Sequence, residues 1–469
     1  MNISKTKNIF FPIESIGREL DYKLLVAINL IEDGERIVFG QHDQIDKIIL
    51  KSKSGIYFGK NIMRSTKESL YNKFKKNKFS IVHLDEEGAI YAGDQDNWRK
   101  TLTNRLNISK MHEDDYVCTW GKFQKDHFEK LSLNNLNKPK INVTGNPRLD
   151  LLKKNYTEYF REEINNIKNK YGEFILINNN FWPLYQESGN QSFFSGNKYS
   201  VIEGAFYHPS LSKRLNLFSS WKNMTFMIGS YIELAHYLSD KFKNLNIIIR
   251  PHPDENLEFY KYVTRDIENI KINDLDNINP LIQSSKLVIH NRCTTGLQAY
   301  MSNKPIVIYD PLRLTDKEDH LLHRTGRICY TMKNVSDVVD QINCENYDFN
   351  TNFNSLDKEL IFNLENESLD KLIPILNESK KRINIKEEIS ISNTQLKIIS
   401  RVKSVYELIK RPIRKNFFNE KYKNYKLAYN HFPGFDKEYL NSKINYLGLK
   451  YNKNVKLNFF GDSLFAISL

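Results

Sequence analysis

Two short apolar runs in this chain each end in a turn that is built of cations, hydroxyls and prolines. Ile247–Ile249 is followed by RPHP at residues 250–253, and Leu287–Ile289 is followed by HNRCTTG at residues 290–296. Runs this short and apolar are typical of parallel strands that are buried on both faces. The carboxyl ends of such strands share one edge with the amino ends of the following helices, where amides, hydroxyls and cations bind anions. The two turns therefore predict one site for a nucleotide phosphate.

Length and charge narrow the possibilities without choosing a function. At 469 residues the chain is too long for one ordinary core, and its 40% of hydrophobic residues is enough to fold more than one. Roughly two to three domains are expected. The net charge of +13 favours polyanionic surroundings such as anionic lipid, nucleic acid or charged sugars, although part of it reflects Lys mixed with Asn, Ile and Tyr throughout.

The cysteines and the amino terminus bear on the cellular compartment. The four cysteines are widely spaced and form no Cys-x-x-Cys pair, which argues against a zinc ribbon or a disulfide scaffold. Residues 1–7 are polar and lead directly into a strand-like run, so a signal peptide is not expected. No apolar run reaches the length of a membrane span. We expect a cytoplasmic protein, and any membrane association is expected to be peripheral at the inner membrane.

The first third of the sequence alternates short apolar segments with amphipathic ones, as a doubly wound α/β domain does. A helix is expected over Arg18–Ile31, whose apolar spacing fits one buried face, with Gly34 as its stop. The strands expected here are Ile9–Ile13, Arg36–Phe39, Gly55–Phe58, Ser80–Leu84, Tyr116–Thr119 and Ile141–Val143. This pattern predicts one Rossmann-type half.

A second alternating unit follows a charged helix that is expected over Leu149–Lys170. Asn279 is predicted to cap a helix with Pro280 at its first position. Residues 180–210 are rich in Asn, Ser, Gly and aromatic side chains and predict a long loop, a lid over the cleft. The strands expected in this unit are Phe174–Asn178, Ile247–Ile249, Ile270–Ile272, Leu287–Ile289 and Pro305–Tyr309.

The two turns that are predicted to bind phosphate, residues 250–253 and 290–296, offer different functional groups. His252 stands between two prolines that fix the backbone, so its imidazole can donate a hydrogen bond or a proton to a leaving phosphate, while Arg250 supplies permanent charge. Thr294, Thr295 and Gly296 stand where a helix begins and suit a phosphate oxygen. The simpler interpretations are an ordinary threonine cap and a histidine that caps the next helix.

An acidic cluster, DEEG at residues 85–88, follows the strand expected at Ser80–Leu84. Closely placed carboxylates raise one another's pKa, so one of them could act as a general base on a hydroxyl. A solvated acidic turn is the simpler interpretation. The sequence leaves open which of the three carboxylates would act, and whether the reaction would retain or invert the sugar configuration.

Together these three signals resemble the signature of bacterial sialyltransferases and Kdo transferases, which is an acidic pair followed by Gly, a His-Pro dipeptide and a Ser/Thr pair. The first acidic position is Glu86, where sialyltransferases commonly have Asp. Over roughly residues 8–312 the chain is also similar to the family called surface carbohydrate biosynthesis proteins. The segments that carry this second resemblance are Phe11–Glu14 with Arg18 and Glu19, Gly145–Asp150, Ile175–Asn178, Arg250–Pro253 and His290–Gly296.

The resemblance implies a GT-B-like α/β fold, in which two Rossmann-type doubly wound domains face a cleft, here with a C-terminal helical extension. The expected division is an acceptor domain at residues 1–168, a nucleotide-sugar domain at 169–350 and a basic helical extension at 351–469. The implied activity is that of a metal-independent glycosyltransferase of capsule or lipopolysaccharide assembly. It would move an acidic sugar, Kdo or a nonulosonate, from a CMP donor to a surface-polysaccharide or glycolipid acceptor.

By the same resemblance, Glu86 or Glu87 is the catalytic carboxylate and His252 meets the departing CMP phosphate. The residues expected to bind the nucleotide and its phosphate are Arg250, Pro253, Asn291, Thr294, Thr295, Gly296 and Asn178. No cofactor and no metal site are expected. Two Asp-x-Asp triplets, Asp94–Asp96 and Asp274–Asp276, stand in polar turns before helices and are interpreted as caps.

Two other interpretations use the same residues. One keeps the architecture and changes the donor, as in polyol-phosphate transferases that use CDP-glycerol or epimerases that act on UDP-sugars. The other makes the chain a polysaccharide- or lipid-binding scaffold. The expected partners are a CMP-activated sugar, a glycan or glycolipid acceptor and an anionic membrane surface that the basic tail after about residue 385 contacts, without nucleic acid.

Overall fold

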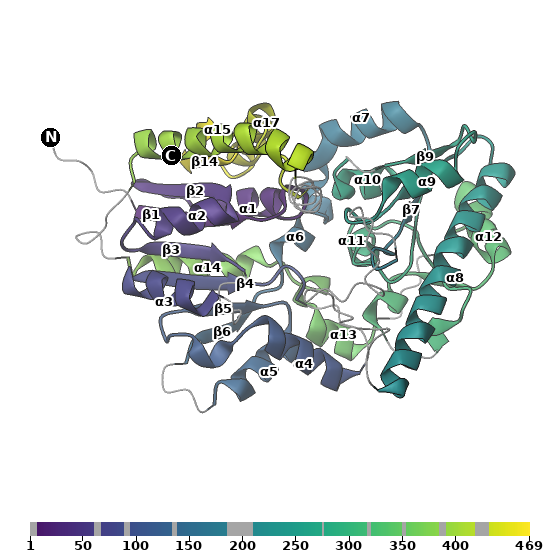
Figure 1. Ribbon diagram of the computed structural model, residues 1–469, viewed down its shortest axis with the longest axis horizontal. Coiled ribbons are helices and arrows are strands. Elements are labelled where there is room, and N and C mark those ends of the chain that lie inside the picture. The colour runs from purple at the N-terminus through teal and green to yellow at the C-terminus, as the bar shows by residue number, and fades with distance from the viewer. Residues whose placement is uncertain are drawn as a thin grey trace. The chain divides into compact units, whose positions relative to one another are not determined.

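The computed structural model forms two compact units, which are described separately (Figure 1). Unit 1 comprises the described residues within 1–151, 354–418 and 431–469, and unit 2 those within 152–353. The residues that the structure describes are 7–60, 67–88, 94–133, 138–184, 210–273, 276–316, 320–348, 353–383, 391–417 and 431–469. The predicted lid falls largely on residues 185–209, which lie outside these ranges.

Unit 1 is built on a sheet of eight strands in the order β13-β14-β2-β1-β3-β4-β5-β6. The strands are β1 (Lys7–Ile13), β2 (Glu35–Gln41), β3 (Gly55–Gly59), β4 (Phe79–Leu84), β5 (Tyr116–Thr119), β6 (Lys140–Val143), β13 (Lys456–Gly461) and β14 (Leu464–Ser468). β1 to β6 are parallel, and all six predicted strands of this unit are confirmed. β13 and β14 were not predicted, and both are antiparallel to their neighbours.

Helix α1 (Ile16–Leu30) confirms the helix that was predicted over Arg18–Ile31, but not its single buried face. Every residue from Glu19 to Ile28 is buried, because α1 packs on the sheet and also against α6, α14 and α17. The helices of unit 1 are α1, α2 (His42–Ile49), α3 (Glu68–Lys76), α4 (Gln95–Arg105), α5 (Lys122–Leu131), α6 (Pro147–Asp150), α13 (Ser355–Leu360), α14 (Leu369–Lys380), α15 (Asn393–Phe417) and α17 (Lys437–Lys450).

Unit 2 is built on a parallel sheet of six strands in the order β12-β11-β10-β7-β8-β9. Its strands are β7 (Phe174–Asn178), β8 (Asn246–Arg250), β9 (Ile270–Ile272), β10 (Leu287–His290), β11 (Ile306–Tyr309) and β12 (Arg327–Cys329). Its helices are α7 (Arg161–Tyr171), α8 (Leu211–Lys241), α9 (Leu257–Val263), α10 (Ile278–Ser284), α11 (Thr295–Met301) and α12 (Met332–Asn343). The predicted strands are confirmed, while β12, α8 and α12 were not predicted.

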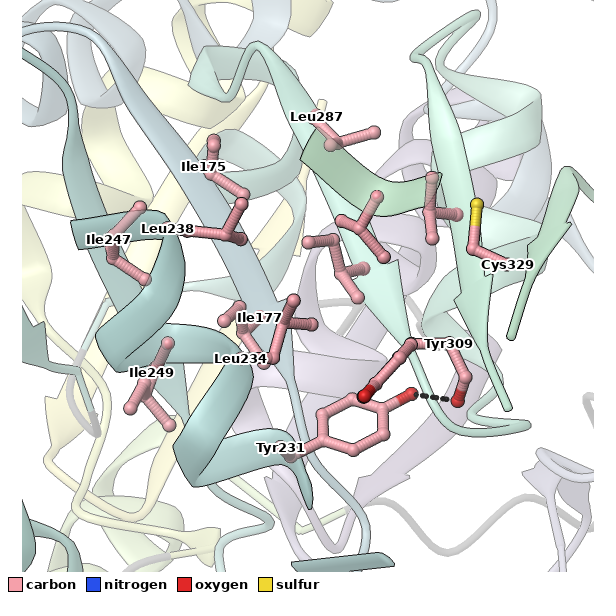
Figure 2. Packing of buried hydrophobic residues seen from close by; sticks show 14 of the residues in the cluster. Ile175, Ile177, Tyr231, Leu234, Leu238, Ile247, Ile249, Leu287, Tyr309 and Cys329 are labelled. Atoms are coloured by element: carbon pink, nitrogen blue, oxygen red, sulfur yellow. Dashed lines mark hydrogen bonds between the residues drawn. The ribbon is translucent and has the colours of Figure 1, made fainter. Parts of the chain in front are cut away.

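Alternate residues of the unit 2 strands pack on opposite faces of the sheet, as a parallel sheet buried on both sides requires. On one face, Ile175 and Ile177 of β7 pack against Leu234 and Leu238 of α8 (Figure 2). Tyr231 of the same helix donates a hydrogen bond from its hydroxyl to the Tyr309 carbonyl oxygen at 2.9 Å. α7, α10 and α11 cover the other face. The predicted doubly wound architecture is thereby confirmed for this unit.

Two helix predictions were wrong in detail. The single helix expected over Leu149–Lys170 is three pieces, α6, a 3₁₀ helix at Lys154–Phe160 and α7, because the backbone is extended at Lys153 and leaves helical geometry again at Tyr156. The cap of α10 is Asn277 and not Asn279, since the Asn277 side chain accepts the hydrogen bond from the Asn279 backbone amide at 3.0 Å.

The units divide the chain differently from the three domains that were predicted. Residues 152–168 belong to unit 2, and the described residues after 354 belong to unit 1 and do not form a separate helical extension. The reason lies at β2, whose outer backbone groups would otherwise be an open sheet edge. β14 pairs with β2, and β13 pairs with β14, so the end of the chain completes the first sheet. Of the helices that the structure describes, none is long and apolar enough to cross a membrane.

Candidate functional site

The acidic turn of unit 1 begins where β4 ends, at the carboxyl edge of the sheet, and its carboxylates stand in different surroundings. Asp85 is held by Arg105, whose Nε and Nη2 lie 2.6 Å from the two carboxylate oxygens. Burial opposes ionisation of Asp85, but Arg105 outweighs it and keeps the pKa well below its ordinary value. Glu87 is 49% exposed and pairs with Arg18 at 2.8 Å and with Arg105 at 3.2 Å. These two cations lower the pKa of Glu87 although burial opposes the shift.

Glu86 differs from Asp85 and Glu87 in its burial and in the direction of its pKa shift. It is 1% exposed, and its Oε1 accepts a short hydrogen bond from the Tyr22 hydroxyl of α1. Its Oε2 is buried and has no hydrogen-bond partner among the described residues. Burial raises the pKa of Glu86, and the nearby charge of Glu19 raises it further. A buried carboxyl group with a raised pKa and one unused oxygen is suited to exchange a proton with a ligand.

Cations around Glu86 partly offset its burial. Lys60, Lys23 and Arg148 all lower its pKa by their charge. Two of these cations pair with Glu19, with Lys23 Nζ at 2.8 Å and Lys60 Nζ at 3.0 Å from its oxygens. The pKa of Glu19 is about 2, since the two lysines outweigh the effect of its burial. Glu19 is therefore an ionised structural anion, which leaves Glu86 as the buried carboxyl whose protonation is open to change.

Arg148 belongs to a motif that the sequence analysis noted but gave no role. Asn146 caps α6, and its backbone amide donates a hydrogen bond to the side-chain oxygen of Asn363 at 2.8 Å. This contact fixes the turn that carries Arg148. The guanidinium lies 5.6 Å from the ring centre of Trp120. Its Nε is buried and makes no hydrogen bond within the described part of the chain. Arg148 thus adds a positive group with an unused donor to the surroundings of Glu86.

In unit 2 the two predicted turns lie at one edge of one sheet. β7 runs between β8 and β10, with Asn178 in register with Arg250 on one side and with His290 on the other. The carboxyl ends of these three strands therefore lie side by side, and this part of the prediction is confirmed. Asn178 stands between the two turns.

Several polar side-chain atoms at this edge of unit 2 are buried and make no hydrogen bond to the described residues. The buried side-chain atoms here without a hydrogen-bond partner among the described residues are Asn178 Oδ1, Asn179 Oδ1 and Nδ2, Asn180 Oδ1, Asn291 Oδ1 and Thr295 Oγ1. Each buried polar atom left without a partner costs about 1–3 kcal/mol. A cluster of them at the carboxyl edge of a parallel sheet marks a place where a polar ligand can supply the partners.

The turn that carries His252 is held by hydrogen bonds to Glu255, a residue that was not predicted to belong to the site. Glu255 Oε1 accepts hydrogen bonds from the backbone amides of Phe181 at 2.6 Å and His252 at 3.2 Å, and its Oε2 accepts one from the Tyr260 hydroxyl. His252 Nδ1 accepts the Asp254 amide at 3.2 Å, so the neutral ring carries its proton on Nε2. The interpretation of His252 as a helix cap is wrong.

The helix after this turn, α9, is capped by Asn256, whose side chain accepts the Glu258 backbone amide at 3.0 Å. Pro253 is exposed, and its contribution to the predicted site is to restrict the backbone of the turn. Arg250 donates from Nη2 to the Asp276 carbonyl oxygen at 3.2 Å, which directs its side chain toward the start of α10.

The second turn leads into α11, and its glycine has a structural reason. Thr294 stands at the cap position, but its side chain makes no capping hydrogen bond. A Cβ atom on Gly296 would lie 2.4 Å from Nε2 of His290, so the ring of His290 occupies the space that a side chain would need. His290 is fully buried, and burial lowers its pKa to about 3. The turn is thus packed on a neutral imidazole.

Asp310, directly after β11, is another residue that the sequence analysis missed. It is buried, and Oδ2 accepts the Thr315 amide at 2.7 Å. Oδ1 has no hydrogen-bond partner in the described ranges. The available signal was the same one that identified the other turns, because Asp310 follows the apolar run Ile306–Tyr309.

Of the two Asp-x-Asp triplets that were predicted to cap helices, only the first can be confirmed. Asp94 caps α4 as predicted, since its side chain accepts the Asn97 amide at 2.9 Å. Asp276 does not cap α10, and Asp274 lies outside the described residues. Within the ranges that are described, no three His, Cys, Asp or Glu side chains are grouped so that they could hold a metal ion.

Polar groups lie at the carboxyl edge of the parallel strands in both sheets, and they define an α/β protein that has a candidate ligand site in each unit. No family model matches the sequence, and no curated protein matches it. Among solved structures, the Methanocaldococcus jannaschii UDP-GlcNAc 2-epimerase in complex with UDP-GlcNAc and UDP is similar with 12% identity and a TM-score of 0.44, over 80% of this chain and 99% of that one.

Two further solved structures are similar to a comparable degree. The UDP-GlcNAc 2-epimerase from Neisseria meningitidis has 12% identity and a TM-score of 0.42, over 80% of this chain and 98% of that one. The wall teichoic acid polymerase TagF has 10% identity and a TM-score of 0.43, over 81% of this chain and 89% of that one.

Proposed function

We propose that this chain is a glycosyltransferase that moves an acidic sugar, Kdo or a nonulosonate, from a CMP donor to a surface-polysaccharide or glycolipid acceptor. The observation that carries the proposal is Glu86, the one carboxyl group of its cluster with a raised pKa and an unused oxygen. Transfer to a hydroxyl needs a group that removes the hydroxyl proton, and an ionised Glu86 can do so. Asp85 and Glu87 are held as ion pairs by arginines and are poorer bases.

In this proposal the carboxyl edge of the unit 2 sheet binds the CMP part of the donor. His252 donates from Nε2 to the departing phosphate, and Arg250 adds positive charge. The residues that complete the nucleotide site are Asn178, Asn291, Pro253, Thr294, Thr295 and Gly296. Support comes from the unused atoms of Asn178, Asn291 and Thr295, which need a polar partner when they are buried.

A monophosphate leaving group fits this set of residues. The CMP phosphate carries its charge on one phosphorus centre, so fixed donors and arginine can stabilise it without a metal ion. We therefore keep the hypothesis that the reaction is metal-independent and needs no cofactor beyond the donor. Cytoplasmic location and peripheral contact with an anionic membrane remain part of the proposal.

One observation favours the runner-up, a polyol-phosphate transferase of the CDP-glycerol type or a UDP-sugar epimerase. Arg18, Lys60 and Arg148 all lie close enough to Glu86 or Glu87 to change their pKa values. Such a group of cations also suits a phosphate-bearing substrate in unit 1. In that case the donor would be a diphosphate nucleotide, and unit 2 would prefer CDP or UDP to CMP.

Nucleotide binding separates the two proposals. Titration calorimetry with CMP, CDP and UDP should give the tightest binding for CMP, and Thr295→Val should weaken it by about tenfold, the usual cost of one lost hydrogen bond to a charged group. Thr264→Val is the matched control, because this buried hydroxyl of unit 2 already donates to the Tyr260 carbonyl at 2.8 Å. UDP or CDP binding without any effect of CMP would favour the runner-up.

Product analysis then tests the reaction itself. The wild-type chain should release CMP from CMP-Kdo or a CMP-nonulosonate faster when a glycolipid acceptor is present. Failure to cleave every CMP-sugar offered, under conditions in which CMP binds, would contradict the proposed activity.

A further inference from the structure

Helix α15 is attached to unit 1 through the side that carries Leu396 and Ser400. Leu396 and Ser400 are fully buried, and Ser400 Oγ lies 3.3 Å from Ser463 Oγ beside the start of β14. Lys403 Nζ lies 2.9 Å from Asp43 Oδ1 of α2. These contacts fix which side of α15 faces the sheet, and Ile398, Val402 and Val405 on the opposite side are each more than half exposed.

That opposite side carries four exposed aliphatic side chains, which we call the apolar stripe. Ile398, Val402, Val405 and Ile409 are 55%, 64%, 55% and 59% exposed. They follow one another at intervals of four, three and four residues, so they lie along one line on the helix surface, about half a turn away from Leu396. Contiguous exposed apolar surface of this kind marks a place of interaction.

The charges next to the apolar stripe are positive. Lys397 and Arg401 are exposed and flank one edge of the stripe. Glu407 is the only acidic residue between Asn393 and Phe417, a segment that contains seven Lys or Arg residues. By its spacing of eleven residues from Leu396, Glu407 lies on the attached side of the helix. The exposed side therefore combines aliphatic side chains with cations.

We propose that α15 docks unit 1 onto an anionic bilayer, with the apolar stripe at the boundary of the acyl chains and Lys397 and Arg401 at the headgroups. An amphipathic helix with this pattern lies in the plane of the interface. The 25 residues of α15 give it a length of about 37 Å along that plane. The proposal deepens the membrane contact in the proposed function and rests on it only for the location of the acceptor.

Substitutions test this surface better than removal of the tail after residue 385, because removal would also take β13 and β14 from the sheet of unit 1. The test variant carries Ile398→Gln, Val402→Gln, Val405→Gln and Ile409→Gln, and Gln keeps the helix because its helix propensity is good. The control variant carries Leu133→Gln, Tyr262→Gln and Leu449→Gln, which are 64%, 66% and 85% exposed elsewhere. Thermal unfolding of both variants should match that of the wild type.

Cosedimentation is measured with vesicles of phosphatidylcholine alone and with vesicles that also contain phosphatidylglycerol. The wild-type chain should bind the anionic vesicles, and the stripe variant should lose about tenfold or more of that partitioning, while the control stays within about twofold. Salt at 0.5 M, where the Debye length is only about 4 Å, should weaken wild-type binding.

Three results would overturn the proposal. They are equal binding by the stripe variant, no binding of either vesicle by the wild type, and a wild-type dimer in light scattering that the stripe variant converts to a monomer. The last result would assign the stripe to a second copy of the chain. CMP binding is measured on the same samples, so loss of the proposed enzymatic function is recognised separately from loss of membrane docking.

Discussion

Three neighbouring carboxylates show how the surroundings of a residue decide its chemistry. Asp85, Glu86 and Glu87 are consecutive and chemically alike, yet the pKa is raised only at Glu86. The sequence predicted the cluster and its place after a strand. It could not rank the three, because the arginines that hold Asp85 and Glu87 come from α1 and α4, which lie elsewhere along the chain.

Glu86→Gln should lower the turnover number of sugar transfer by about 10²–10⁴-fold, the usual contribution of a general base. Glu87→Gln is the matched control and should cost less than about tenfold, because Glu87 is half exposed and already paired with Arg18. Steady-state kinetics with a CMP-sugar donor measure both. Similar losses in the two variants would argue against Glu86 as the base.

The pH dependence of the wild-type reaction gives a second test of Glu86. Its pKa lies above the ordinary value because of burial and the charge of Glu19. Since the base must be ionised, activity should rise with pH as Glu86 loses its proton. The rise should vanish in the residual activity of Glu86→Gln, and a profile of unchanged shape in that variant would contradict the assignment.

The raised pKa of Glu255 predicts how the free energy of unfolding depends on pH. Burial raises its pKa to about 7, against an ordinary value of 4.5, although the Tyr260 hydroxyl and two backbone amides favour the ionised form. The stabilising contribution of Glu255 is therefore full below about pH 4.5 and is lost as the pH rises through about 7. Urea unfolding of the wild type and Glu255→Gln should show the wild type losing about 1–3 kcal/mol relative to the variant between pH 5 and pH 8. A constant difference would show that Glu255 is ionised throughout.

At the scale of elements, burial on both faces made the parallel strands predictable. Ile247–Ile249 and Leu287–Ile289 are apolar at every position, and their surroundings in the sheet explain why. β13 gave no such signal, since Lys456 and Asn458 interrupt its apolar residues. β14 contains the short apolar run Leu464–Ile467, but no helix-strand alternation around it marked it as part of a sheet. The packing of α11 on His290 could not be predicted either, because it depends on a tertiary contact at Gly296.

Gly296→Ala should destabilise unit 2 by about 1–3 kcal/mol, the range for forcing an extra methyl group into a packed site. The new Cβ would lie 2.4 Å from the His290 ring, which cannot move away easily because it is fully buried. Gly229→Ala in α8 is the matched control, since nothing lies within 4 Å of a Cβ there. That change should stabilise the helix by about 0.5–1 kcal/mol. Thermal unfolding measures both, and equal effects would contradict the packing argument.

At the scale of the whole molecule, the sequence predicted two Rossmann-like sheets, and both are present. It did not predict that the last residues of the chain return to the first sheet. Phe465 of β14 stacks on Phe39 of β2 with ring centres 4.6 Å apart, although more than 400 residues separate the two. No local pattern reports a pairing over such a separation.

The pairing predicts how stability is distributed between the units. Phe465 is fully buried, so Phe465→Ala should destabilise unit 1 by about 3–5 kcal/mol through the cavity and the lost apolar contacts. Leu469→Ala is the control at the next exposed position after β14, where the side chain is 40% exposed and a change within about 0.5 kcal/mol is expected.

Calorimetric unfolding measures the stability of each unit, and nucleotide binding reports on unit 2. Phe465→Ala should lower only the transition of unit 1 and leave nucleotide affinity within about twofold, because β14 belongs to the first unit alone. A common shift of both transitions would mean that the two units unfold as one cooperative body, in which case the end of the chain stabilises the nucleotide site as well as the sheet it completes.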